Sequence, residues 1–223
     1  RVAWGKSLNA GQTCIAPDYL LIDKSVKELF VEEYRRALGE LHGDDVQHSH
    51  HYVRMVSDSA FQRVAGYLCD GRVVVGGRVD ASDRYIEPTL LDEVSADSDV
   101  MQNEIFGPVL PMIEVSNIDE AIAFINSREK PLALYVFANK CVARKVVDCT
   151  SSGGGCVNDT IMHIVNENMP FGGVGNSGMG RYHGRDSLYA FSHRRSIVTT
   201  PTWIDMPFRY MPYRWFKRIK RLL

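Results

Sequence analysis

The sequence predicts an α/β protein with a mostly parallel sheet and flanking helices. Two observations support this class. Short apolar runs of strand length alternate along the chain with segments in which apolar residues recur at three- and four-residue steps. No internal repeat is visible. Strands that are separated by helices favour parallel pairing, because each crossover returns the chain to the same edge of the sheet.

The first half of the chain supplies three helices and two strands. The opening RVAWGKSL (1–8) has the pattern of a helix interior, and DYLLID (18–23) is a buried strand. The next helix starts at Ser25, which forms an S-x-x-E capping box with Glu28, and Gly43 ends it. A further helix is expected over 60–69, followed by a strand over 72–77 that ends in glycines.

The second half repeats the alternation. VLPMIEV (109–115) is a strand, and Asn117 with Glu120 caps a helix that continues through Ile125. The remaining elements are a strand over 132–138, a helix over 141–149 and a strand over 154–158. Beyond Asp159 the pattern ends, and the chain becomes glycine-rich, then extended, then basic.

Composition and charge set limits on function. The 223 residues are 45% hydrophobic and 24% charged, with a net charge of -1, so no global charge draws the chain to nucleic acid or a membrane. The five cysteines include no C-x-x-C pair, which argues for a reducing, cytoplasmic compartment. His48, His50 and His51 lie in a polar loop without nearby cysteine, so no metal site is predicted.

A glycine motif at residues 173–178 matches G-x-G-x-x-G, the dinucleotide fingerprint. That fingerprint requires a strand before it and a helix after it. The flanking NENMPF and MGRYHGRDS fit neither element. These glycines are therefore expected to allow close backbone approach rather than to bind phosphate.

Cys14 is the first candidate for chemistry. It follows Gly-Gln-Thr in SLNAGQTCIAPDY, a setting of polar and small residues that is typical of a turn. A nucleophilic thiol must be reachable, and nearby amides can stabilise an oxyanion. On these features alone, a reactive thiol and an inert one both remain open. The other cysteines, Cys69, Cys141, Cys149 and Cys156, are expected in the core.

Glu104 and Phe106 are the second candidates, in NEIFGPVLP (103–111). A carboxylate can accept hydrogen bonds from two vicinal hydroxyls, and a neighbouring ring can flank a planar ligand. By themselves, however, the two residues favour a solvated glutamate and a packed phenylalanine.

Taken together, NAGQTC, FGPVLP, SSGGGCVND, PFGGVGNSGMGRYHG and FSHRRS resemble the aldehyde dehydrogenase superfamily, and most of all its class 3 branch, which includes fatty aldehyde dehydrogenases. The resemblance extends from Arg1 to about Pro201. It implies an enzyme that oxidises aldehydes to acids with NAD or NADP. It also implies a cysteine thiohemiacetal, hydride transfer to nicotinamide, and a thioester that water hydrolyses.

Residue by residue, the resemblance implies that Cys14 is the nucleophile. Glu104 would hold the nicotinamide ribose hydroxyls, Phe106 would flank the ring, and Phe171 would line the substrate pocket. Asn158 is expected to be structural.

The same resemblance implies three parts. Residues 1–160 would be a catalytic α/β domain without its first portion, 161–200 a β extension that pairs subunits in a homodimer, and 201–223 a basic tail. The family's general base and dinucleotide domain lie upstream of these motifs. We therefore expect a C-terminal portion of an enzyme that is inactive alone.

The tail allows a different prediction. On a helical wheel, Trp215, Phe216, Ile219, Leu222 and Leu223 share one face opposite basic residues, so 212–223 is a candidate for peripheral contact with the cytoplasmic face of a membrane. A truncated, non-catalytic protein that dimerises or associates with membranes is accordingly the alternative function. A thiol acyltransferase or esterase is a third, and it leaves Glu104 and Phe106 without a role.

Overall fold

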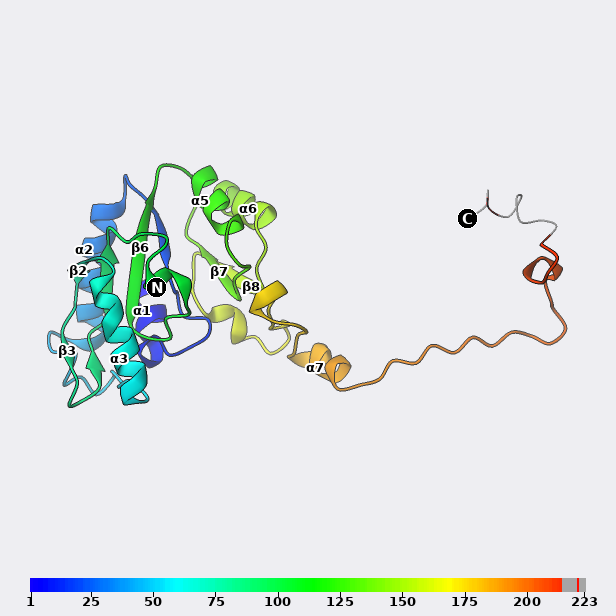
Figure 1. The fold of residues 1–223 in the computed structure, drawn as a ribbon, viewed down its shortest axis with the longest axis horizontal. Helices are drawn as coiled ribbons and strands as arrows, with labels where there is room; N and C mark the ends of the chain where they lie inside the picture. The colour runs from blue at the N-terminus through cyan, green and yellow to red at the C-terminus, as the bar shows by residue number, and fades with distance from the viewer. Residues whose placement is uncertain (214–219, 221–223) are drawn as a thin grey trace. The chain divides into compact units, whose positions relative to one another are not determined.

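A computed structural model describes residues 1–213 and 220, and the chain divides into two compact units, residues 1–190 and 191–223 (Figure 1). The first unit holds the sheets and nearly all the helices. Its strands are β1 (Leu20–Asp23), β2 (Arg72–Val75), β3 (Val79–Asp80), β4 (Tyr85–Ile86), β5 (Thr89–Asp92), β6 (Val109–Val115), β7 (Ala133–Val136) and β8 (Gly154–Val157). Its α-helices are α1 (Val2–Ser7), α2 (Lys27–His42), α3 (Asp58–Gly66), α4 (Asp99–Gln102), α5 (Ile118–Asn126), α6 (Lys140–Cys149) and α7 (Gly184–Ala190).

The main sheet has four strands in the order β1-β6-β5-β2. β6 pairs in parallel with both β1 and β5, while β2 runs antiparallel to β5. A second sheet pairs β7 with β8 in parallel, and β3 and β4 form a short antiparallel ribbon. The predicted α/β class is confirmed, and the antiparallel β2 makes the main sheet a mixed one.

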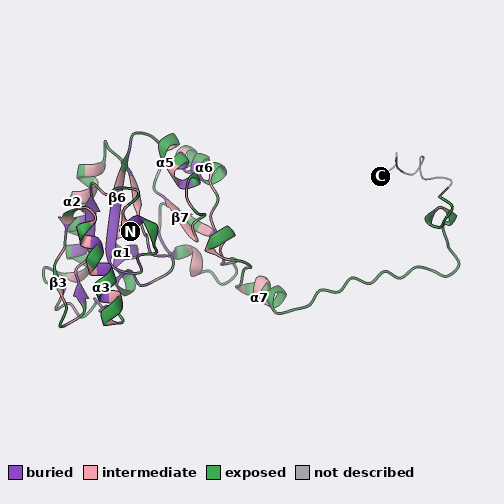
Figure 2. Cartoon of the chain, in the orientation of Figure 1, coloured by how far each residue is buried: buried purple, intermediate pink, exposed green. Residues whose placement is uncertain are grey.

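Helices cover both faces of the main sheet because its central strands are apolar on both sides. In β5, Leu90 packs with Tyr34 and Leu38 of α2, whereas Leu91 packs with residues of α3 on the opposite face. Successive side chains of a strand point to opposite faces, so neighbouring leucines serve two separate clusters. Figure 2 shows β6 buried between these layers and the outer sides of the helices exposed.

The second sheet has its own small core. Ile122 of α5, Val136 of β7, and Ala143 and Val146 of α6 form one buried cluster. The caps of its helices follow the sequence: Asn117 Oδ1 accepts the Glu120 amide at 3.0 Å, and Asn139 Oδ1 accepts the Val142 amide at 3.0 Å.

The predicted capping box at Ser25 is wrong. Asp23 accepts hydrogen bonds from the Ser25 amide at 2.8 Å and from the Ser25 hydroxyl at 2.6 Å. Ser25 thus completes a turn after β1, and α2 begins after Val26 without a side-chain cap. Gly43 does end the helix, with a φ of 80° and its amide bonded to Gly39.

The rest of the chain has little regular structure. In the first unit, residues 161–190 contain the turns η3 (Met162–Ile164) and η4 (Gly175–Ser177), helix α7 and one antiparallel bridge between Phe171 and Tyr182. In the second unit, η5 (Pro207–Arg209) is the regular element among residues 191–213 and 220. Strand pairing between copies through 161–200 stays a prediction.

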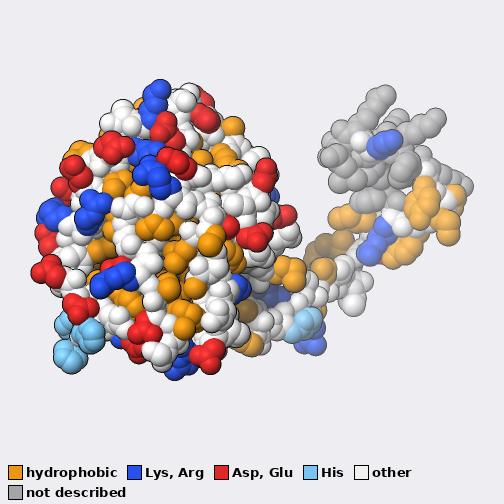
Figure 3. Space-filling view, turned by 60° about the vertical axis from the view of Figure 1, so that its left-hand side comes forward, with side chains coloured by type: hydrophobic (Ala, Val, Ile, Leu, Met, Phe, Trp, Pro, Cys, Tyr) orange, Lys and Arg blue, Asp and Glu red, His pale blue; other side chains and the backbone are white. Residues whose placement is uncertain are grey.

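Two structural observations bear on membrane association. Among residues 1–213 and 220, no helix has the length and apolarity to cross a bilayer. The amphipathic helix expected within 212–223 falls almost wholly outside the described residues. On the face in Figure 3, acidic and basic side chains are interspersed rather than gathered by sign.

Candidate active site

Cys14 lies in a loop with an unusual backbone. Asn9, Ala10 and Gly11 all adopt positive φ angles, of 52°, 50° and 70°. For a residue with a Cβ this left-handed conformation costs of order 1 kcal/mol or more, and it persists where the surroundings enforce it. Here Ala10 is buried against Tyr52 and Tyr85, and the turn leaves Cys14 exposed to solvent.

Gln12 holds this loop in place. Its Nε2 donates to the carbonyl oxygens of Asn9 and Arg54, both at 3.1 Å, and its Oε1 accepts the Val56 amide at 2.9 Å. The side chain of Asn9 donates in turn to the Gln12 carbonyl at 3.0 Å. The cysteine loop is therefore tied both to itself and to the segment that precedes α3.

A second loop packs directly against the first. A Cβ on Gly11 would lie 2.1 Å from the carbonyl oxygen of Gly107, so the two backbones touch. Gly107 follows Phe106, and a Cβ on Gly107 would in turn meet Val64 of α3 at 2.7 Å. The structure thus brings the loop of Cys14 beside the loop of Glu104 and Phe106, which we call the acidic loop (residues 103–108).

The acidic loop is strained at its aromatic residue. Phe106 has a φ of 47°, rare for a bulky side chain, and 38% of its surface is exposed. Arg63 of α3 fixes the backbone before it, because its guanidinium donates to the carbonyl oxygens of Glu104 at 3.2 Å and Ile105 at 2.9 Å. Ile105 is fully buried and anchors the loop.

Glu104 is exposed, and no group among the described residues donates a hydrogen bond to its carboxylate. Partial burial and the nearby Asp18 raise the pKa of Glu104, while Arg63 and Lys6 act in the opposite sense. The carboxylate is consequently available to accept hydrogen bonds from a ligand.

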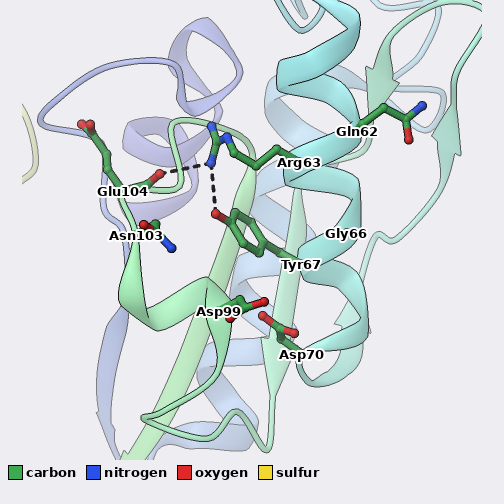
Figure 4. Close-up of a pocket in the computed structure, with 8 residues that line it drawn as sticks. All are labelled: Gln62, Arg63, Gly66, Tyr67, Asp70, Asp99, Asn103 and Glu104. Atoms are coloured by element: carbon green, nitrogen blue, oxygen red, sulfur yellow. Dashed lines mark hydrogen bonds between the residues drawn. The ribbon is translucent and has the colours of Figure 1, made fainter.

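A pocket of about 800 Å³ lies between α3 and the acidic loop (Figure 4). Arg63 links Tyr67 to the Glu104 carbonyl across it, whereas the Glu104 carboxylate points away from the other lining side chains. Asp70 is already engaged by the Val100 amide at 2.7 Å. The pocket is lined by Gln62, Arg63, Gly66, Tyr67, Asp70, Asp99, Asn103 and Glu104.

Beneath both loops lies Lys6 of α1, whose side chain is fully buried. Its ammonium is 3.6 Å from a carboxylate oxygen of Asp18, close enough for an ion pair but too far for a hydrogen bond. The other Asp18 oxygen accepts the Ile105 amide at 3.3 Å. Burial lowers the pKa of Lys6 to about 8, although Asp18 and Glu104 favour its charged form.

Ile15, the residue after Cys14, is held from the opposite side. Its carbonyl accepts a hydrogen bond from the Tyr135 hydroxyl of β7 at 2.7 Å. Its side chain packs with Ile161 and Phe171 in a small cluster. Phe171 therefore lies in the layer that supports the cysteine loop, and its ring is buried among Ile15 and the aromatic ring of His163.

Two sequence expectations outside these loops have clear outcomes. Asn158 is structural: it has a φ of 56°, accepts the Ala138 amide at 2.9 Å and donates to the Ala138 carbonyl at 3.1 Å. Within 173–178, Gly173 serves close approach, because a Cβ on it would lie 2.1 Å from the Ser177 carbonyl oxygen, whereas a Cβ on Gly175 would meet nothing closer than 3.7 Å.

The expectation that the other cysteines belong to the core is wrong for three of them. Cys69, Cys141 and Cys149 are exposed, while Cys156 is half-buried with its sulfur 3.6 Å from His163 Nδ1. In α6 the buried stripe is Ala143 and Val146, so the cysteines near its two ends face solvent. Among residues 1–213 and 220, no group of three His, Cys, Asp or Glu side chains could hold a metal ion.

Sequence reasoning missed four residues that build the site: Lys6, Gln12, Arg63 and Tyr135. Lys6 carried a usable signal, since it lies three residues after Ala3 on the buried side of α1. Gln12, Arg63 and Tyr135 act on backbone groups distant in sequence, and no local pattern indicates such contacts.

Known proteins resemble this chain in sequence and in fold. The aldehyde dehydrogenase family model matches residues 1–197. A dimeric, NADP-preferring aldehyde dehydrogenase from Rattus norvegicus is 53% identical over 199 residues, which cover 89% of this chain and 44% of the relative. Aldehyde dehydrogenase family 3 member B1 from Homo sapiens is 51% identical over 199 residues, which cover 89% of this chain and 42% of the relative.

Among solved structures, the substrate-bound state of Staphylococcus aureus AldH superposes with a TM-score of 0.89 at 45% identity, covering 100% of this chain and 49% of that one. The chain thus spans about half the length of the relatives it matches. With a family match over residues 1–197 and relatives from family 3, the chain belongs to the aldehyde dehydrogenase family.

Proposed function

We propose that this chain supplies the nucleophile and one wall of the cofactor site of an NAD(P)-dependent aldehyde dehydrogenase. The observation that carries the proposal is the contact between two strained loops. Gly11 packs against Gly107, so the loop with the exposed Cys14 thiol contacts the loop that carries the exposed Glu104 and Phe106. Backbone strain maintained at two adjoining loops is typical of functional sites.

The chemistry assigned to Cys14 is addition to an aldehyde carbonyl. The thiolate forms a carbon–sulfur bond, and the carbonyl π electrons move to oxygen to give a thiohemiacetal alkoxide. Among the described residues, no acceptor receives the amide N–H of the exposed Cys14, so this donor is free to bind that alkoxide. Tyr135 fixes the loop by holding the Ile15 carbonyl.

The residues present fit a nicotinamide dinucleotide. The Glu104 carboxylate has free acceptor positions for two ribose hydroxyls, and the Phe106 ring is exposed beside it. A bound nicotinamide would supply the hydride acceptor, and loss of hydride from the alkoxide carbon would leave a thioester on Cys14. Water then hydrolyses that thioester to the acid, a step that needs a general base.

The rest of the assignment extends from the relatives. The rat relative is named dimeric and NADP-preferring, so a homodimer and a preference for NADP are proposed for the whole protein. Aliphatic or aromatic aldehydes of medium or long chain are the proposed substrates. Phe171 as a pocket residue, the division into residues 1–160, 161–200 and 201–223, and membrane contact through 212–223 remain predictions.

The test measures the rate of NAD or NADP reduction by the natural full-length protein with a series of aldehydes. Cys14→Ala should abolish turnover but retain dinucleotide binding, whereas Glu104→Gln should weaken that binding. Turnover that survives Cys14→Ala would contradict the proposal. The 223-residue chain on its own is expected to be inactive, and its aldehyde-dependent signal should not exceed that of buffer.

A further inference from the structure

Lys6 is a buried charge that the proposed reaction does not use. Its side chain is fully buried, and its ammonium has no hydrogen-bond partner among the residues that the structure describes. Taking an ammonium out of water is strongly unfavourable unless a partner compensates its charge. An apolar residue of the same length would avoid that cost, so a lysine here calls for a role.

Lys6 forms its ion pair with Asp18, and the two carboxylate oxygens of Asp18 have different partners. One carboxylate oxygen lies 3.6 Å from the Lys6 ammonium. The other accepts the Ile105 amide at 3.3 Å, and Ile105 is the fully buried residue between Glu104 and Phe106. Asp18 thus connects Lys6 to the backbone of the acidic loop.

Arg63 holds the same stretch of backbone from the opposite side. It donates to the carbonyl oxygens of Glu104 and Ile105, while Asp18 takes the Ile105 amide. A peptide gripped at both its N–H and its C=O cannot rotate freely. This grip fixes the direction in which the neighbouring Glu104 side chain leaves the backbone.

Charge balance supports the same conclusion. Partial burial and, after it, Asp18 raise the pKa of the Glu104 carboxyl, and Arg63 and Lys6 oppose that rise. Removal of Lys6 would leave Arg63 to oppose the rise in the pKa of Glu104. An ionised Glu104 is the form that accepts two hydroxyl hydrogen bonds.

We propose that Lys6 is a positioning residue that aligns the Glu104 carboxylate for the dinucleotide ribose, acting through Asp18 and the Ile105 amide. The inference rests on the proposed cofactor role of Glu104. By this proposal, a buried residue of α1 controls cofactor affinity. The reactivity of the thiol, which lies on a different loop, does not depend on it.

The experiment measures two quantities in the natural full-length protein: the Kd for NADH and NADPH by fluorescence, and the rate of Cys14 alkylation by iodoacetamide. Lys6→Met keeps the length and apolar volume of the side chain but removes its charge. We expect Kd to rise about three- to tenfold, with the alkylation rate within twofold of wild type. Kd within twofold of wild type, or a parallel change in Kd and alkylation, would overturn the proposal.

Asp18→Asn provides the second arm, because it keeps an oxygen acceptor for Ile105 and removes only the charge. It should also raise Kd, and it decides the matter if Lys6→Met does not fold; an unchanged Kd in Asp18→Asn would count against the inference. Lys145→Met is the matched control. It removes the exposed ion pair with Asp119, at 2.5 Å between α6 and α5, and should leave both readings at the wild-type value.

Glu104→Gln distinguishes a failure of the cofactor role of Glu104 from a failure of the positioning role of Lys6. If it weakens dinucleotide binding and Lys6→Met does not, the cofactor site stands and the role of Lys6 is refuted. If Glu104→Gln also leaves Kd unchanged, the proposed cofactor site itself fails.

Discussion

Gly11 and Gly107 meet so closely that a Cβ on the first would lie 2.1 Å from the carbonyl oxygen of the second. The contact joins the loop that carries Cys14 to the loop that carries Glu104, across more than ninety positions of sequence. Gly11 also has a φ of 70°, a conformation that glycine adopts without penalty. The close contact with Gly107 and the positive φ therefore each require a glycine at position 11.

Gly11→Ala should be among the most damaging small substitutions in the chain. Strain at positive φ and the clash with Gly107 together predict a loss of about 2–5 kcal/mol in the free energy of unfolding. Gly39→Ala is the matched control, since Gly39 lies within α2 with nothing within 4 Å of its added Cβ. It should stabilise the protein by about 0.5–1 kcal/mol. Urea denaturation of both variants measures the difference, and equal effects would contradict the packing argument.

The elements most accurately predicted from sequence are those whose patterns are local. β6 was predicted at 109–115 and has those limits, because a continuous apolar run is what a strand buried on both faces requires. The Asn117 cap was predicted for the same kind of reason, as donor and acceptor lie within one turn. β5 was missed: its four residues are all buried, but Thr89–Asp92 is too short to show a period.

In the candidate site, too, the residues that were predicted are those with a local sequence pattern. Cys14 and Glu104 were identified through motifs, whereas Arg63 and Tyr135 act on backbone groups 41 and 120 positions away. The exposed cysteines show the opposite error. Its place on a predicted helix suggested burial for Cys141, but helix phase in α6 decides which side chains face the core.

Thiol modification should separate Cys14 from the other exposed cysteines. Cys69, Cys141 and Cys149 are exposed as well, so a thiol reagent will label several sites. In the natural full-length protein, we expect alkylation of Cys14 alone to remove activity, and Cys14→Ser to lower turnover by at least about a thousandfold, as for other essential nucleophiles. Cys141→Ser should behave as wild type. Mass spectrometry of partially labelled protein, plotted against residual activity, checks this; inactivation that tracks Cys141 labelling would refute the assignment.

The hydrogen bond from Tyr135 to Ile15 predicts a contrast between two tyrosines. Tyr135→Phe loses a 2.7 Å bond to the residue after the nucleophile, which should cost about 1 kcal/mol of stability and slow Cys14 alkylation. Tyr34→Phe instead removes a buried hydroxyl that has no hydrogen-bond partner among the described residues. That change should be neutral or stabilising. Thermal melts of the two variants test the contrast, and a larger loss in Tyr34→Phe would overturn it.

The pKa of Lys6 makes a prediction about stability in alkaline solution. Burial lowers this pKa to about 8 in the folded protein from an ordinary value of 10.5. Between these values the unfolded chain binds a proton that the folded chain does not, so the Lys6 contribution to the free energy of unfolding rises with pH. The slope approaches about 1.4 kcal/mol per pH unit at most. Below pH 8 both states are protonated, and the contribution is constant.

Lys6→Met removes this contribution, so the difference in unfolding free energy, wild type minus variant, should increase from pH 8 to pH 10. Tyrosines and other lysines titrate in the same range, but they are common to both proteins and cancel in the difference. Lys145→Met supplies the contrast: its ion pair with Asp119 raises the pKa of Lys145, so its contribution is lost only above the ordinary lysine range. Urea denaturation at pH 7, 8, 9 and 10 measures both differences. If the Lys6→Met difference stays flat while the protein remains folded, the Lys6 ammonium is not held at a lowered pKa.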